Sequence, residues 1–250
     1  MTLRLAHLSD LHFGEAPPQM VESLAEDLAA ASPDALLVSG DLTRRAEPEE
    51  FAAALGFLQR FDKPLLIVPG NHDIPRMDLM QRFLSPRRRW QAAEMGALDG
   101  VLDLGDTCII GVDTVRRAQW HLDWSAGGIS SRRLLVLSDR LRAAAGRRVI
   151  VMCHHPLRHP TWAVGRKKPR GARTTLGLLR EAGVQAVISG HLHRAEGLGE
   201  EPRQFIAPSA LSPRLRGTGR NGWLLLTLDE AGLQVEARER VEGEWQARML

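Results

Sequence analysis

Five short clusters of Asp, Asn and His are the residues of this 250-residue chain best suited to chemistry, and each follows an apolar run. They are Asp10-Leu11-His12, Gly40-Asp41, Gly70-Asn71-His72-Asp73, His154-His155-Pro156 and Gly190-His191-Leu192-His193. Asp-x-His and His-x-His place both side chains on one side of an extended backbone, because side chains alternate along a strand. Carboxylate and amide oxygens with imidazole nitrogens suit Mn²⁺, Fe or Zn²⁺. The clusters therefore predict a metal site.

A single motif of this kind is weak evidence. One Asp-x-His or His-x-His often arises by chance, and a lone His on a strand is usually a core residue. Five such clusters, all at the ends of apolar runs, favour a common site. The glycines before Asp41, Asn71 and His191 are typical of tight turns that bring the backbone close to a ligand.

The elements that must position these clusters follow from hydrophobic patterning. Apolar runs predict buried strands at residues 3–8, 35–38, 65–68, 108–112, 149–153 and 184–188. Helical spacing predicts helices at 20–31, 48–61, 134–145 and 174–182. Alternating strands and helices indicate an α/β fold with a mostly parallel sheet covered by helices. In such sheets ligands bind at the carboxyl ends of the strands, where the five clusters lie.

The C-terminal part has a different pattern. Strand patterns at 223–228 and 233–238 flank a predicted turn at 229–232, so antiparallel strands are expected between residues 203 and 240. Residues 75–100 and 114–133 show the least regular pattern. Since no linker or repeat interrupts the chain, residues 1–250 are expected to form one domain with a motif-bearing core at 4–193.

Composition narrows the class of protein. With 44% hydrophobic and 25% charged residues the chain is expected to be globular, which argues against a disordered or fibrous protein. Two Cys are too few for a disulfide scaffold or a Cys-based zinc site and suit a reducing compartment, whereas nine His are more than packing requires. The net charge of +3 is too small to indicate a nucleic-acid binder. Because signal-peptide and membrane-span patterns are missing, a cytoplasmic protein is expected, with association to a membrane surface left open.

The motifs SDLH, GDLT, GNHD, HHP and GHLH resemble those of the calcineurin-like metallophosphoesterase superfamily. Within it, the chain is most similar to compact bacterial phosphodiesterases of the cyclic-AMP type. The resemblance extends from about residue 4 to residue 193. It implies a four-layer α/β/β/α sandwich with mixed sheets and a dinuclear site for two divalent metal ions, Mn²⁺, Fe²⁺/Fe³⁺ or Zn²⁺.

The resemblance also implies a role for each matching residue. Seven positions match metal ligands: Asp10, His12 and His193 at one ion, Asn71, His154 and His191 at the other, and Asp41 between them. His72 matches the residue that assists the leaving group, and Asp73 matches a residue that orients that histidine. His155 adjoins the site without an assigned role.

Two ions about 3.5–4 Å apart would clamp the attacking and leaving oxygens, with a metal-bridging hydroxide as nucleophile. We therefore expect hydrolysis of a phosphodiester bond in a small molecule, with cyclic nucleotides as candidates. The short intervals between the motifs leave little room for a cap domain, which favours small or extended substrates. The alternatives are a pyrophosphatase of a nucleotide-linked lipid at the membrane surface, a nuclease acting on nucleic acid, and a non-catalytic scaffold.

Substrate contacts are less clearly indicated. Arg158 and Arg194 flank ligand positions and could bind a substrate phosphate. The basic clusters 87–89 and 166–170 fit either solvated loops or contact with an anionic substrate or membrane. Trp120, Trp124 and Trp162 fit either core packing or a wall that stacks on the substrate.

Overall fold

The computed structural model describes residues 2–117, 125–213, 215 and 219–250, and its strands form two six-stranded mixed sheets. The first sheet has the order β12-β11-β10-β1-β2-β3. Its strands are β1 (Leu3–Leu8), β2 (Ala35–Val38), β3 (Leu65–Ile67), β10 (Gly222–Asp229), β11 (Gly232–Val241) and β12 (Glu244–Met249). Strands β1, β2 and β3 are parallel, and β10 joins β1 in antiparallel orientation.

The second sheet has the order β4-β5-β6-β7-β9-β8. Its strands are β4 (Val101–Leu104), β5 (Thr107–Val112), β6 (Arg148–Cys153), β7 (Ala186–Ser189), β8 (Glu196–Leu198) and β9 (Arg203–Ile206). Strands β5, β6, β7 and β9 are parallel, whereas β4 and β8 are antiparallel edge strands.

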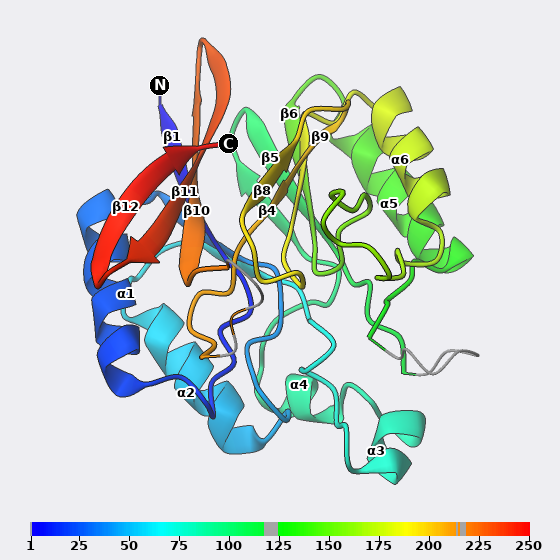
Figure 1. The fold of residues 1–250 in the computed structure, drawn as a ribbon. Coiled ribbons are helices and arrows are strands. Elements are labelled where there is room, and N and C mark those ends of the chain that lie inside the picture. The colour runs from blue at the N-terminus through cyan, green and yellow to red at the C-terminus, as the bar shows by residue number, and fades with distance from the viewer. Residues whose placement is uncertain (1, 118–124, 214, 216–218) are drawn as a thin grey trace.

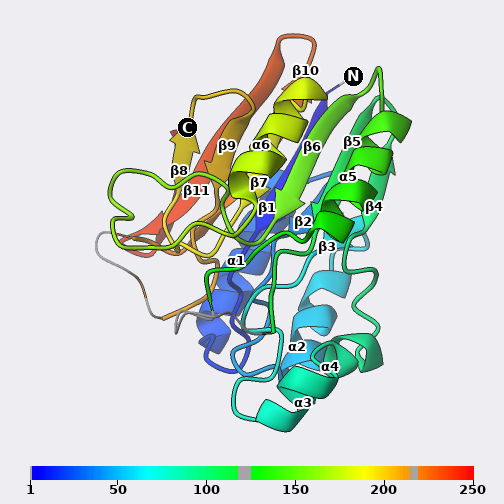
Figure 2. The ribbon, with the colours of Figure 1, turned by 90° about the vertical axis from the view of Figure 1, so that its right-hand side faces the viewer.

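Helices cover the outer faces of both sheets. Helices α1 (Pro18–Ala31) and α2 (Pro48–Gln59) lie on the first sheet, and α5 (Ser131–Ala143) and α6 (Ala172–Glu181) lie on the second (Figures 1 and 2). Two short helices, α3 (Leu79–Leu84) and α4 (Arg88–Ala92), extend from the lower end in both views. The expected four-layer α/β/β/α sandwich is confirmed.

Local sequence sets the helix boundaries. Both α1 and α2 begin with a proline, which is suited to the first turn of a helix because no partner exists there for its missing N–H. Glu47 and Glu50 cap the start of α2 reciprocally. Ser32, which has left-handed backbone geometry, caps the C-terminus of α1.

Successive side chains of each strand point to opposite faces of its sheet. They form three apolar layers, one between the two sheets and one between each sheet and its helices. In β1, Ala6 and Leu8 pack toward the helices, whereas Leu5 packs between the sheets. In β6, Ile150 faces the first sheet and Val151 faces the helices α5 and α6. Each buried strand thus supplies side chains to two layers, as the near-continuous apolar runs indicate.

The C-terminal part divides between the two sheets, which differs from the single antiparallel group expected for 203–240. Strand β9 lies beside β7 in parallel orientation, while β10 and β11 form the expected hairpin, with Asp229 opposite Gly232. Strand β12 extends that hairpin beyond residue 240. Within the described ranges, no helix has the length and apolar character needed to cross a bilayer.

Candidate metal centre

The structure brings all seven expected metal ligands together at the carboxyl ends of five parallel strands. Asp10 and His12 follow β1, Asp41 follows β2, and Asn71 follows β3. From the second sheet, His154 follows β6, and His191 and His193 follow β7. Both sheets therefore contribute ligands to one centre, which is possible because their parallel strands end at the same edge of the sandwich.

Asp10, His12 and His193 form one cluster. The Asp10 Oδ1 atom lies 3.0 Å from His193 Nε2 and 3.8 Å from His12 Nε2. The two Nε2 atoms are 3.3 Å apart, and all three side chains are buried. One cation between these atoms would be bound by one carboxylate and two imidazoles.

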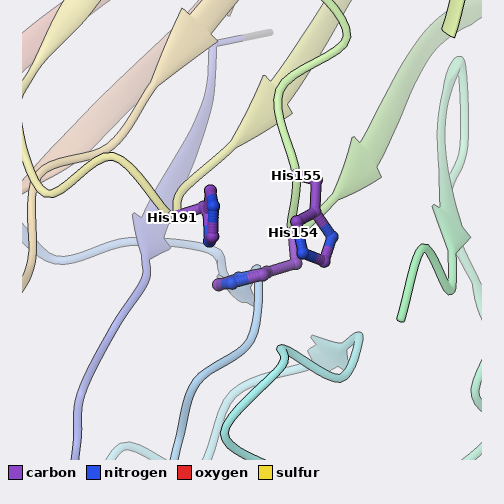
Figure 3. A group of neighbouring side chains, drawn as sticks. All are labelled: His154, His155 and His191. Carbon is purple, nitrogen blue, oxygen red and sulfur yellow. The ribbon is translucent and has the colours of Figure 1, made fainter. Parts of the chain in front are cut away.

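Asp41 connects this cluster to a second one. Its Oδ2 atom lies 4.0 Å from His12 Nε2 and 3.4 Å from His154 Nε2. The Nε2 atom of His154 is 3.2 Å from Asn71 Oδ1, and the His154 and His191 ring centroids are 5.2 Å apart. Figure 3 shows His154, His155 and His191 gathered at the ends of β6 and β7. The carboxylate of Asp41 thus lies between two groups of donors.

Hydrogen bonds orient the ligands toward the centre. The Nδ1 atoms of His12 and His154 lie 3.3 Å and 2.8 Å from the carbonyl oxygens of Thr43 and Ser39, which leaves Nε2 of each ring for a cation. Asp10 Oδ2 accepts hydrogen bonds from the Ser9 hydroxyl and the His191 N–H, whereas the buried Oδ1 lies against His193 Nε2. A carboxylate oxygen and imidazole nitrogens that converge in a buried volume are suitable donors for a divalent cation, so the residues fit a metal site.

Five of the seven ligands have left-handed backbone geometry. Their φ angles are 53° at Asp10, 46° at His12, 53° at Asp41, 70° at His191 and 59° at His193. Such φ values are uncommon for residues with a side chain, and they concentrate at functional sites. The turns direct consecutive ligands into one small volume.

Glycines allow the ligand loops to approach one another, as the sequence predicts. A Cβ atom on Gly70 would lie 2.1 Å from Asp41 Oδ1, and one on Gly40 would lie 2.4 Å from the Gly70 nitrogen. A Cβ atom on Gly190 would lie 1.7 Å from Ser9 Oγ. The loops after β1, β2, β3 and β7 can therefore meet only where side chains are missing.

The ionisation states suit a cation. Burial raises the pKa of Asp10 and Asp41, but neighbouring histidines outweigh it and both pKa values lie below their usual range. Burial lowers the pKa of His12 and His191, which keeps these rings neutral and able to bind metal. For His154, burial also lowers the pKa, but Asp41 outweighs it and raises the value to about 9. Cation binding therefore has to displace a proton from His154.

His72 lies at the rim of the centre, with its ring edge-on to His12 at a centroid distance of 4.9 Å. The Nδ1 atom of His72 is 2.9 Å from the carbonyl oxygen of Arg44 and 3.0 Å from its Nη1 atom. Arg44 is held in turn by Glu15, with 2.7 Å between Nε and Oε1. The sequence does not indicate a role for Arg44, because this residue belongs to none of the five motifs.

The expected role of Asp73, the orientation of His72, stays a prediction, and the contacts of its carboxylate lie with the loops after β2 and β3. Its carboxylate accepts hydrogen bonds from the N–H and hydroxyl of Thr43 and from the Gly70 N–H. These bonds join the loops after β2 and β3, whereas Arg44 orients the His72 ring. Burial, followed by repulsion from Asp41, raises the pKa of Asp73 to about 6.

His155 supports the centre from behind. Its Nδ1 atom lies 2.7 Å from Thr114 Oγ1, and its Nε2 atom lies 2.6 Å from the Ser125 carbonyl oxygen. Burial, reinforced by His154, lowers its pKa to about 3. Both ring nitrogens therefore have protein partners, and His154 is the member of the pair that faces Asp41. Cys153, which directly precedes His154, packs in the core.

The two arginines expected to bind substrate have other partners. The Arg158 guanidinium donates to the carbonyl oxygens of Glu200, Glu201 and Pro202 and secures the loop before β9, and its expected contact with a substrate phosphate stays a prediction. Arg194 stacks on Trp162 with 4.9 Å from its Cζ atom to the ring centroid. Trp162 donates to Glu196, which places it beside Arg194 in a partly exposed contact.

The basic clusters differ from each other. In 87–89, Arg87 pairs with Asp113, and Arg89 pairs with Glu47. In 166–170, Lys167, Lys168 and Arg170 are exposed. Trp120 and Trp124 lie outside the described residues.

Comparison with known proteins agrees with the geometry. The model of the calcineurin-like phosphoesterase family matches residues 3–195. A cAMP/cGMP dual specificity phosphodiesterase of Mycobacterium tuberculosis is 28% identical over 76% of this chain and 61% of its own length. A glycerophosphodiester phosphodiesterase of Enterobacter lignolyticus is 26% identical over 61% of this chain and 56% of its own. The chain thus spans less than two thirds of these curated relatives.

The fold also has solved counterparts. A dimetal phosphatase from Danio rerio superimposes with a TM-score of 0.68 over 99% of this chain and 98% of that chain, at 14% identity. At that identity the likeness concerns the fold alone.

Proposed function

Because the chain belongs to the calcineurin-like phosphoesterase family, we propose that it hydrolyses a phosphodiester bond in a small molecule with two divalent metal ions. The observation that carries the proposal is Asp41, whose carboxylate lies between the Asp10-His12-His193 cluster and the Asn71-His154 pair. Bound ions would supply charge neutralisation at the phosphoryl oxygens and acidify a water molecule. With nitrogen and oxygen donors, Mn²⁺, Fe and Zn²⁺ are the candidates.

His72 is proposed to protonate the leaving oxygen, and Arg44 is proposed to position it. When the neutral His72 ring accepts a hydrogen bond at Nδ1 from Arg44 Nη1, it carries its proton on Nε2 and can donate a hydrogen bond to the leaving oxygen. Full proton transfer needs the imidazolium, whose Nδ1–H donates to the Arg44 carbonyl oxygen before and after the Nε2 proton leaves. Arg44 therefore orients the ring in both protonation states. Asp73 holds the loops of Thr43 and Gly70 so that His72 keeps its place.

Cyclic nucleotides are the first substrates to test, since the Mycobacterium relative is named as a cAMP/cGMP phosphodiesterase. The Enterobacter relative, named as a glycerophosphodiester phosphodiesterase, supports the same reaction class. A panel with Mn²⁺ would compare bis-p-nitrophenyl phosphate, cyclic AMP, single-stranded DNA and p-nitrophenyl phosphate. We expect the diesters to exceed the monoester in kcat/KM. A large preference for the monoester would contradict the proposal, and a preference for DNA would favour a nuclease.

A second candidate is the hydrolysis of a nucleotide-linked lipid. An apolar surface begins four residues after Asp73, and Met77, Met80 and Leu84 are 86%, 75% and 77% exposed. Exposed apolar side chains on a segment that directly follows the GNHD loop suit a lipid chain or a membrane interface. Cosedimentation with anionic vesicles tests this candidate: wild type should bind, and Met77→Ser/Met80→Ser should not. Equal binding of both proteins would contradict it.

A further inference from the structure

An arginine-lined cavity of about 610 Å³ lies beside the metal centre. The arginines that line it are Arg87, Arg116, Arg117, Arg133 and Arg170, and we call it the arginine cavity. Ile74, which directly follows Asp73, forms part of its wall. Val115 forms another part, and it directly follows Thr114, the partner of His155. The cavity therefore lies between the loops after β3 and β5, at the edge of the sheets that carries the metal ligands.

Two adjacent glycines separate the arginine cavity from the metal centre. A Cβ atom on Gly127 would lie 2.5 Å from the His155 ring. A Cβ atom on Gly128 would lie 2.7 Å from Arg116 Cδ and 3.3 Å from Arg170 Cβ. One turn of backbone thus contacts the histidine behind the metal centre on one side and two cavity arginines on the other.

The positive charge of the cavity is only partly neutralised. Asp113 pairs with Arg87, at 2.5 Å, and with Arg133, while Asp99 lies 3.7 Å from Arg133. In the described part of the chain, the guanidinium groups of Arg116 and Arg170 have no hydrogen bond or ion pair. Two cationic groups therefore face the cavity without an internal counter-ion.

The N-terminus of α5 adds to the positive electrostatic potential in the cavity. Ser130 and Ser131 line the cavity, and Ser130 caps the helix through the Arg133 N–H. Helix α5 connects the parallel strands β5 and β6, so its N-terminus lies at their carboxyl ends (Figure 2). The N-terminus of a helix carries partial positive charge, which favours an anion.

We propose that the arginine cavity binds a second anionic group of the substrate, of the phosphate-monoester class, while the scissile diester lies at the metal centre. The inference rests on the proposed phosphodiesterase function and narrows it. The preferred substrate is a cyclic or linear nucleotide with one phosphate more than the scissile one. Arginine suits this ligand because its planar fork donates two parallel hydrogen bonds to phosphate oxygens.

A matched pair of substrates tests the proposal. The dinucleotide ApA contains the diester alone, and its 5′-phosphorylated form pApA adds one phosphate monoester. For the Mn²⁺-loaded protein we expect kcat/KM for pApA to exceed that for ApA by about tenfold or more, since charge-assisted hydrogen bonds are involved. Equal values would overturn the proposal.

Variants of the cavity arginines test whether the preference for pApA over ApA arises at this cavity. In Arg116→Gln/Arg170→Gln the pApA-to-ApA ratio should fall to near one, whereas Arg142→Gln, at the other end of α5, should keep the wild-type ratio. A ratio retained in the double variant would overturn the assignment to this cavity. If sulfate changed the ApA rate of wild type but not of the double variant, while wild type showed no preference for pApA, the cavity would bind a free anion, and the assignment to the substrate would be wrong.

The two proposals can fail separately. If bis-p-nitrophenyl phosphate, cyclic AMP and both dinucleotides all resist cleavage, the proposed function fails. Calorimetric Kd values for pApA and ApA then still test the cavity, because its proposed role requires pApA to bind about tenfold more tightly than ApA.

Discussion

Gly70→Ala is the most direct test of how the ligand loops form the metal centre. The new Cβ atom would lie 2.1 Å from Asp41 Oδ1 and 2.2 Å from the Asp41 backbone nitrogen. Ordinary contacts begin near 3.4 Å, so Asp41 and its backbone have to move by more than 1 Å. Misplacement by about 1 Å at a reacting centre can reduce the rate about 100-fold. Overpacking of this kind also costs about 1–3 kcal/mol of stability.

The assay compares Gly70→Ala with Gly56→Ala, which makes the same chemical change within α2. A Cβ atom on Gly56 meets no atom within 4 Å, so we expect a gain in stability of about 1 kcal/mol from helix propensity. Metal analysis, urea unfolding and kcat for bis-p-nitrophenyl phosphate are measured for both. Gly70→Ala with two bound metal ions and wild-type kcat would refute the argument that Gly70 sets the position of Asp41.

The remaining predictions concern single side chains. Asp41→Ala should lose turnover and both metal ions together in metal analysis, because both clusters share this carboxylate. His72→Ala should keep both ions and lose turnover, chiefly for substrates with poor leaving groups; loss of both ions would contradict its role. Arg44→Gln should lower kcat about tenfold, shift its pH profile and leave KM nearly unchanged, since Arg44 acts through His72. Burial lowers the pKa of His7 to about 3, below its ordinary value of 6.5, so its contribution to stability is lost as the pH falls from 6.5 toward 3. In urea unfolding with EDTA, His7→Gln should therefore lose about 3 kcal/mol less than wild type between pH 7 and pH 4; an equal loss would contradict this.

The sequence predicts well which side chains meet at this centre, because each follows a strand whose apolar run is easy to recognise. Asp10, Asp41 and Asn71 lie where parallel strands end, and the fold has to bring such ends together. Gly70 and Gly190 can also be recognised in the sequence, because both belong to the motifs. In the structure a side chain at either position would collide with residues of another motif.

Partners supplied by distant loops could not be predicted. Arg158 is adjacent to a ligand motif in sequence, but the carbonyl groups at 200–202 hold its guanidinium. Arg44 has no motif, yet the loop after β3 brings His72 to it. Strand β9 joins the second sheet, where Phe205 packs between the sheets and Ile206 packs beside Leu192. The four residues of this strand do not by themselves distinguish the second sheet from the first.

The left-handed backbone at five metal ligands has an evolutionary consequence. Among residues with a side chain, Asn, Asp and His adopt these φ angles most readily, and glycine adopts them freely. A single change from His to Gly can therefore remove a proposed ligand, and one from Asp to Asn can remove its negative charge, without straining the turn that carries the residue. Catalysis can be lost in one step while the fold and its surfaces persist. A lineage built on this architecture can convert an enzyme into a binding protein without passing through an unfolded intermediate.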